Sequence, residues 1–167
     1  MKLDYAAVRA SDEIRTYITQ ADASLIAMGY TEHSFAHVAK CAETAAGLLS
    51  QLGYDERQVE LAKIAGYMHD IGNVVNRVDH AQSGAVMAFR ILDKMGMDPE
   101  DVAVVVTAIG NHDEHTAFPV NAVAAALILA DKTDVRRSRV RNRDTISFDI
   151  HDRVNYAVER SDLTLDK

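Results

Sequence analysis

Apolar residues recur at helical spacing along almost the whole chain from residue 5 to residue 135. In the clearest segment, residues 38–52, they follow one another at intervals of three or four, which places them on one face of an α-helix. A half-buried strand would instead alternate with a period of two. The chain has only 2 Pro and 8 Gly in 167 residues, so few positions disfavour helix. We therefore predict an all-α fold.

Capping residues divide this pattern into separate helices. Ser11, Asp55 and Asp98 each precede a periodic run, as N-cap residues do. Gly29 and Gly53 follow such runs as C-terminal stops. The predicted helices cover residues 5–28 with a break near 10–12, 38–52, 55–71, 80–96, 99–111 and 123–135. The last is almost wholly apolar, and we expect it to be the most buried.

The C-terminal residues follow a different pattern. Ile146, Phe148 and Ile150 alternate with polar residues, and Leu163 and Leu165 alternate again, which is typical of half-buried strands. We therefore predict a helical domain over residues 1–144 and an extension over residues 145–167. The extension is expected to form a short strand or hairpin, or to be truncated.

Charge and cysteine content restrict the partners and the compartment. The formal net charge is −7, so no general basic field exists to hold a nucleic-acid backbone. Cys41 is the only cysteine, and we expect it to be a buried small side chain rather than a nucleophile. The N-terminus has no apolar run of the signal-peptide kind, and no segment approaches the roughly 20 apolar residues of a membrane span. These features predict a soluble cytoplasmic protein that binds neither membrane nor nucleic acid.

Several ionisable residues extend apolar helical faces. His37, His69, His112 and Asp131 lie on such a face or directly beyond it, and so point inward. One such histidine alone would more often be a hydrogen-bonded core residue. A buried carboxylate, however, must be paired, hydrogen-bonded or bound to a cation. Because imidazole and carboxylate ligands arriving from several helices suit a divalent first-row metal, the set predicts a metal site.

The segments around these residues resemble, in order, a known superfamily. HVAKCA, GYMHDIGN, HAQSGA, AIGNHDEH and LILADKTD are similar to segments of the HD superfamily of metal-dependent phosphohydrolases. A His-Asp pair alone is common, whereas an apolar-HDIG segment with an upstream histidine and a downstream aspartate on an apolar helix is specific. The resemblance covers residues 30–140 and implies an HD-domain helical bundle.

The resemblance also implies the ligands of a dinuclear centre. His37, His69, Asp70 and Asp131 match the residues of one metal site, with Asp70 as the bridging carboxylate. His80 and His112 occupy the positions that complete a second site. The expected cofactors are two divalent ions, Fe or Mn first, with Ni, Co or Mg as alternatives.

The activity implied is hydrolysis of a phosphoester or phosphoanhydride bond in a nucleotide-like substrate, by a hydroxide that bridges the two metals. The sequence looks most like the branch of the superfamily that hydrolyses diadenosine tetraphosphate. It departs from many members at Asn73, where they have Lys, so that a cation near the site is missing.

Other residues near the expected ligands are candidates for substrate contacts. Asp70, Lys132 and His33 are the predicted catalytic positions, and Asn111 or Asp113 would orient a ligand or water. The predicted substrate-binding residues are Arg77, Arg136, Arg137 and His115. The arginine run over residues 136–143 is explained either as the solvated end of the last helix or as a phosphate-capturing cluster. His151 is expected to be an ordinary surface residue.

Two functions of other classes fit the same residues. One is a mixed-valent di-iron oxygenase, because some members of the superfamily activate oxygen with the same ligands. The other is a non-catalytic sensor that binds a nucleotide and reports to a partner. Whether the protein is a homodimer is also left open.

Overall fold

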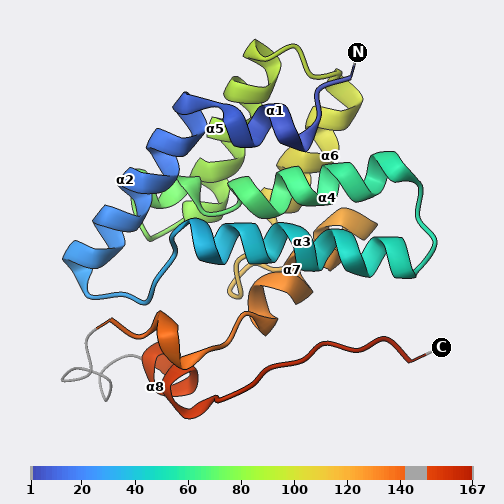
Figure 1. The fold of residues 1–167 in the computed structure, drawn as a ribbon. Coiled ribbons are helices and arrows are strands. Elements are labelled where there is room, and N and C mark those ends of the chain that lie inside the picture. Colours follow the sequence, from blue (N-terminus) through green and yellow to red (C-terminus); the bar gives the residue numbers. More distant parts are fainter. Residues whose placement is uncertain (1, 142–149, 167) are drawn as a thin grey trace.

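The computed structural model describes residues 2–141 and 150–166 (Figure 1). Over these two ranges the chain forms eight α-helices, two short 3-10 helices and no β-strand, which confirms the all-α prediction. None of these helices is long and apolar enough to cross a membrane. The α-helices are α1 (Tyr5–Ala10), α2 (Asp12–Met28), α3 (Phe35–Gln51), α4 (Glu56–Met68), α5 (His80–Lys94), α6 (Pro99–Gly110), α7 (Ala122–Thr133) and α8 (Ile150–Ala157), and the 3-10 helices are η1 (Ile71–Val74) and η2 (Arg137–Arg139).

Local capping sets most of the helix boundaries at the predicted places. The Ser11 side chain accepts a hydrogen bond from the backbone N–H of Ile14, so α2 begins at the expected break. Asp55 and Asp98 cap α4 and α6 in the same way. Gly29 has a φ of 82°, the left-handed conformation that ends α2.

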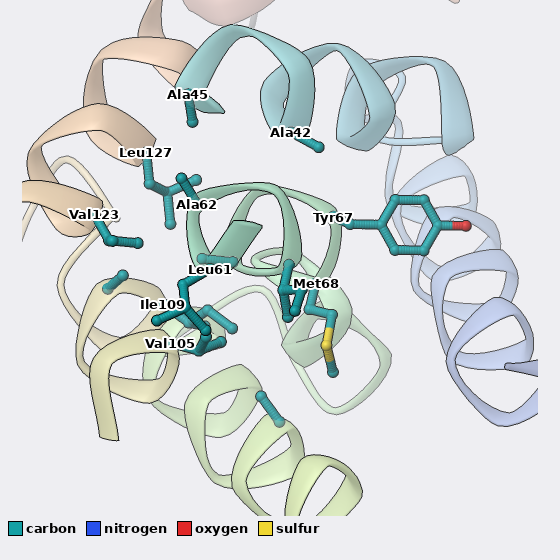
Figure 2. Packing of buried hydrophobic residues seen from close by; sticks show 14 of the residues in the cluster. Ala42, Ala45, Leu61, Ala62, Tyr67, Met68, Val105, Ile109, Val123 and Leu127 are labelled. Atoms are coloured by element: carbon teal, nitrogen blue, oxygen red, sulfur yellow. The ribbon is translucent and has the colours of Figure 1, made fainter. Parts of the chain in front are cut away.

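Helix α4 lies at the centre of the bundle, surrounded by α3, α6 and α7 (Figure 2). Seven of its 13 residues are buried, against five of 12 in α7, so the prediction that α7 is the most buried helix is wrong. Helix α3 approaches α4 closely because Gly66 has no side chain. A Cβ there would come within 2.7 Å of the Ala42 backbone. This packing places the C-terminal end of α4, and with it His69 and Asp70, inside the protein.

The chain leaves α4 earlier than the periodicity predicts and turns sharply toward α5. Helix α4 ends at Met68 rather than near Ile71, and η1 begins at Ile71 after the turn formed by His69 and Asp70. A Cβ on Gly72 would overlap the His80 carbonyl, so only glycine lets the first turn of α5 lie against η1. Asp79 takes a φ of 56° immediately before α5. These two residues bring His80 beside the end of α4.

The strand prediction for the C-terminal extension is wrong where the structure describes it. Ile150 begins α8, in which Ile150 and Val154 are one helical turn apart. Leu163 and Leu165 belong to an irregular segment, because no neighbouring strand of the described chain is there to pair with them. Ile146 and Phe148 lie outside the described residues. The division at residues 144 and 145 falls there too and stays a prediction.

We predict that Gly72→Ala destabilises the protein by about 2 kcal/mol or more, because the new methyl group must displace the backbone of α5. Thermal unfolding followed by circular dichroism measures the effect. Gly47→Ala is the matched control, since Gly47 lies within α3 with nothing within 4 Å of the added Cβ. It should stabilise the protein by up to about 1 kcal/mol. Equal effects of the two substitutions would contradict the close approach of η1 and α5.

Candidate metal centre

Four buried histidines from four helical regions surround the carboxylate of Asp70. The Nε2 atoms of His37 and His69 lie 3.5 and 3.1 Å from its Oδ2 atom. The Nε2 atoms of His80 and His112 lie 3.5 and 3.9 Å from its Oδ1 atom. Each oxygen of one carboxylate thus faces two imidazole nitrogens.

The other nitrogen of each of these rings is held by an acceptor of its own. The Nδ1 atom of His69 lies 2.8 Å from the Gly66 carbonyl, and that of His80 lies 3.0 Å from the Arg77 carbonyl. The Nδ1 atom of His112 lies 2.6 Å from the Ile109 carbonyl, and that of His37 lies 2.8 Å from Asp134 Oδ2. Since a carbonyl or carboxylate oxygen only accepts, Nδ1–H must donate. In a neutral ring the lone pair is then on Nε2, the form in which histidine binds a metal.

Asp131 joins the half of the cluster that faces Asp70 Oδ2. Its Oδ1 atom lies 3.3 Å from His37 Nε2 and 3.7 Å from His69 Nε2. Cys41 is buried against the same half, with its sulfur 3.7 Å from both ring nitrogens of His37. Two adjacent groups of potential ligands therefore share Asp70.

The chemistry of these groups fits divalent metal ions. His69 Nε2 and Asp70 Oδ2 are buried and have no hydrogen-bond partner within the described part of the protein. Such atoms are costly to bury unless a cation satisfies them. Ligand atoms of His37, Cys41, His69 and Asp131 lie within 4.8 Å of one another, and so do those of His69, Asp70 and His112. With Asp70 shared between them, His37, His69 and Asp131 could hold one ion and His80 and His112 a second. Imidazole nitrogen and carboxylate oxygen suit a first-row divalent metal and do not by themselves name it.

Without metal, the two halves differ in protonation. Burial lowers the pKa of His69, but the carboxylates of Asp70 and Asp131 outweigh it and raise that pKa to about 10. In the other half, burial lowers the pKa of His112 to about 4 and also lowers that of His80. Protons thus compensate the carboxylates in the half that contains Asp131, whereas the histidines of the other half are neutral at pH 7.

Asp134 is a site residue that the sequence reasoning missed. It is almost fully buried, and its Oδ2 atom accepts the hydrogen bond from His37. Arg136 and Lys40 pair with its Oδ1 atom at 2.9 and 3.3 Å. The available signal was its position three residues after Asp131, at the end of the same apolar helix.

Asn73 has a defined role beside Asp70, although it replaces an expected lysine. Its side-chain amide donates to the backbone carbonyl and to Oδ1 of Asp70, at 3.0 and 3.1 Å. Its own Oδ1 atom accepts a hydrogen bond from Arg77 (3.3 Å), whose guanidinium group lies over the Tyr30 ring. Arg77 therefore supplies a cation next to the cluster, and Asn73 positions both it and Asp70.

A cavity of about 410 Å³ opens beside the cluster. Asp70 and Asp131 line it together with three of the candidates for substrate contacts, His33, Arg77 and Lys132. Lys132 Nζ lies 3.0 Å from Asp131 Oδ2. Asp113 lines the cavity as well, whereas Asn111 donates to the Thr107 carbonyl within α6.

The structure does not bring three other candidates into this cavity. The Arg136 side chain contacts Asp134 and Glu32, Arg137 contacts the Tyr156 carbonyl, and the His115 side chain is 83% exposed on the surface. The solvated-helix-end interpretation of the arginine run is wrong, because α7 ends at Thr133 and Arg139 is buried. His151, expected to be an ordinary surface residue, lines the cavity.

Comparison with known proteins identifies the family. The HD domain family matches residues 34–138, and the chain belongs to it. Ribonuclease Y of Opitutus terrae is 30% identical over 112 residues, which make up 67% of this chain and 20% of that protein. The crystal structure of a predicted HD superfamily hydrolase from an uncultured Thermotogales bacterium superposes with a TM-score of 0.58 and 30% identity, and covers 73% of this chain and 66% of that one. The chain thus spans a fifth of the first relative and just under two thirds of the second.

We predict that Asp134→Asn lowers metal affinity by about tenfold to a hundredfold, because the amide holds the His37 ring without the negative charge that makes it a better ligand. Titration of the metal-free protein with Mn²⁺ against a chelating indicator measures the affinity. Asp93→Asn, which changes an exposed carboxylate on α5, is the control and should leave it unchanged. Full affinity in Asp134→Asn would contradict the role assigned to Asp134.

The pKa of His69 predicts how the stability of the metal-free protein depends on pH. Its pKa rises from an ordinary value of 6.5 to about 10 on folding, so the protonated ring stabilises the fold fully below pH 6.5. This contribution disappears as the pH rises from 6.5 to 10. The unfolding temperature of chelator-treated protein should therefore fall over this window, and less so in His69→Gln. Parallel profiles for the two proteins would disprove the ion pair.

Proposed function

We propose that this chain is a metal-dependent phosphohydrolase that cleaves a phosphoester or phosphoanhydride bond of a nucleotide-like substrate. The observation that carries the proposal is the arrangement around Asp70, where each carboxylate oxygen faces two histidine Nε2 atoms at 3.1–3.9 Å. A carboxylate placed in this way would bridge two cations. Two-metal sites of this kind serve phosphoryl chemistry in many hydrolases.

The relatives support the same reaction class. One is named a predicted hydrolase of the HD superfamily, and the other is a ribonuclease by name. A ribonuclease cleaves phosphodiester bonds, so the likeness favours attack at phosphorus. The resemblance to enzymes that hydrolyse diadenosine tetraphosphate adds dinucleoside polyphosphates to the substrates that need testing.

The metals, when bound, would lower the pKa of a water molecule and polarise the phosphoryl group. The residues of the chain would bind and orient the substrate. Lys132 and Arg77 line the cavity as cationic donors for phosphoryl oxygens. Asp131 keeps the Lys132 ammonium group beside the ligands. Fe or Mn is the expected metal.

His33 provides a hydrogen-bond acceptor at the same cavity. Burial lowers its pKa to about 3, so the ring is neutral at pH 7. Its Nδ1–H group donates to the Thr31 carbonyl (2.7 Å), which leaves the lone pair on Nε2. His33 would therefore accept a hydrogen bond from water or substrate rather than bind phosphate as a cation.

Divalent ions would add positive charge for a phosphate anion beside a cavity that is rich in carboxylates. Five carboxylates line it, against the three permanent cations Arg77, Lys132 and Arg139. The carboxylates therefore exceed the permanent cations, and in the metal-free protein the protonated rings of His37 and His69 beside the cavity offset this excess.

We predict that protein loaded with Fe, Mn, Ni or Co hydrolyses at least one member of a panel of mononucleotides, cyclic dinucleotides and dinucleoside polyphosphates. Phosphate or nucleotide release is measured under reducing and oxidising conditions. Asp70→Asn should abolish turnover, and Lys132→Ala should reduce kcat about a hundredfold or more. Asp93→Asn is the control with unchanged activity.

Three results would contradict the proposal. Full activity in Asp70→Asn would exclude the cluster as the active site. Oxygen uptake with a mixed-valent iron spectrum would indicate the oxygenase instead. Tight nucleotide binding without turnover for any metal would indicate the sensor.

A further inference from the structure

Helix α8 closes one side of the cavity, although it lies outside the part of the chain that matches the HD family. The family match ends at residue 138, and α8 begins at Ile150. Ile150, His151, Val154 and Asn155 all line the same cavity as Asp70. Figure 1 shows α8 beside η2, beyond the C-terminal end of α7. Helix α8 therefore borders the cavity from outside the residues that match the family.

Hydrogen bonds fasten α8 to the segment that follows α7. The Arg136 backbone N–H donates to the Asn155 side-chain oxygen (3.0 Å), and Arg137 Nε donates to the Tyr156 carbonyl (2.8 Å). The Arg137 guanidinium group also lies over the Tyr156 ring, 5.0 Å from its centroid. These contacts fix the position of the helix relative to the cluster of ligands.

A second attachment joins α8 to the loop between α6 and α7. His151 Nε2 lies 3.2 Å from Glu114 Oε1, and Glu114 also lines the cavity. The loop that carries Glu114 carries His112 as well. Helix α8 is thus held by the segment after α7 and by the loop between α6 and α7, and both segments contain residues of the candidate metal centre.

The side chains that α8 presents to the cavity include two apolar ones. Ile150 and Val154 are 66% and 48% exposed, so they contribute little to the core. They line the same cavity as the cationic groups of Arg77 and Lys132. A ligand with both an anionic group and an apolar body matches this combination, since a phosphate alone would leave the aliphatic side chains without a contact.

The size and charge of the cavity favour a compact ligand over a polynucleotide strand. A volume of about 410 Å³ lies near the lower end of the range of about 300–1,000 Å³ for small-molecule pockets. Channels for single-stranded nucleic acid are instead positively charged grooves with a series of stacked aromatic rings. Here the carboxylates outnumber the lysine and arginine side chains, and Tyr30 is the only aromatic side chain other than histidine among the described lining residues.

We propose that α8 is the specificity wall of this site, which admits a phosphate ester of mononucleotide size and excludes dinucleotides and longer strands. Ile150 and Val154 contact the nucleoside part of the ligand, and Arg137 holds the wall in place from outside the cavity. The proposal rests on the proposed function in placing the phosphate at the candidate metal ligands.

Calorimetric binding to the Mn-loaded full chain tests this without any need for turnover. The probes are a phosphonate analogue of AMP, in which a methylene group replaces the ester oxygen, and the same analogue extended by a second nucleotide. The parent protein should bind the small probe at least about tenfold more tightly. The double variant Ile150→Ala/Val154→Ala should bind the small probe about tenfold to a hundredfold more weakly, because both truncations remove apolar contact area.

The variant Arg137→Ala distinguishes a role of α8 in specificity from an effect of general destabilisation. It changes no lining side chain, so the small probe should still bind, while the preference over the extended probe should fall at least about threefold as α8 loosens. Val86→Ala on α5, 69% exposed and away from the cavity, is the matched control and should change neither affinity.

The outcomes for α8 and for the hydrolase are distinguishable. Unchanged binding in the double variant, equal binding of the two probes by the parent protein, or binding of neither would overturn the assignment of α8. Binding as expected together with a failure to hydrolyse any phosphate ester would support the assignment of α8 and overturn the proposed function.

Discussion

The carboxylate of Asp70 is the constraint on which the rest of this structure depends. It is buried in a helical core, with two histidine nitrogens facing each of its oxygens. Burying such a group without compensation would cost more than a typical side-chain contact returns. The fold resolves this by bringing partners from α3, α5 and the ends of α4 and α6. The same compensation creates a place for cations, so the stability of the core and the chemistry of the site have one origin.

That convergence requires backbones to approach one another closely at two glycines. Gly66 lets α3 contact α4, which brings His37 toward His69. Gly72 lets α5 begin against η1, which brings His80 toward the other oxygen of Asp70. The glycine of the HDIG segment is thus a packing requirement as much as a turn. The positions of the candidate ligands are fixed because they lie in helices or within two residues of a helix end in the packed bundle.

Much of the fold could be predicted from the sequence because its signals are local. Ser11, Asp55 and Asp98 act within one helical turn, and the apolar spacing fixes which faces are buried. The candidate ligands could be proposed because each extends such a face and because the ordered segments resemble a family. The role of Asp134 could not be inferred in this way, since its hydrogen bond to His37 joins residues 97 positions apart. The alternation at Leu163 and Leu165 led to a wrong strand prediction, because a strand needs a partner that a local pattern does not supply.

The arginine segment after α7 shows how one short sequence connects the site with its wall. The spacing predicted either a solvated helix end or a cluster for phosphate, but most of these guanidinium groups are engaged by the protein itself. The Arg136 side chain pairs with Asp134, which holds the His37 ring, while its backbone N–H holds Asn155 of α8. Arg139 donates to the carbonyls of Asp134 and Glu32, and so fixes the turn between them. Because one residue contacts both the support of a candidate ligand and the helix that limits the cavity, the position of α8 and the geometry of the cluster are mechanically linked. A short segment beyond the residues that match the family thus borders the cavity and is tied to the support of a candidate ligand.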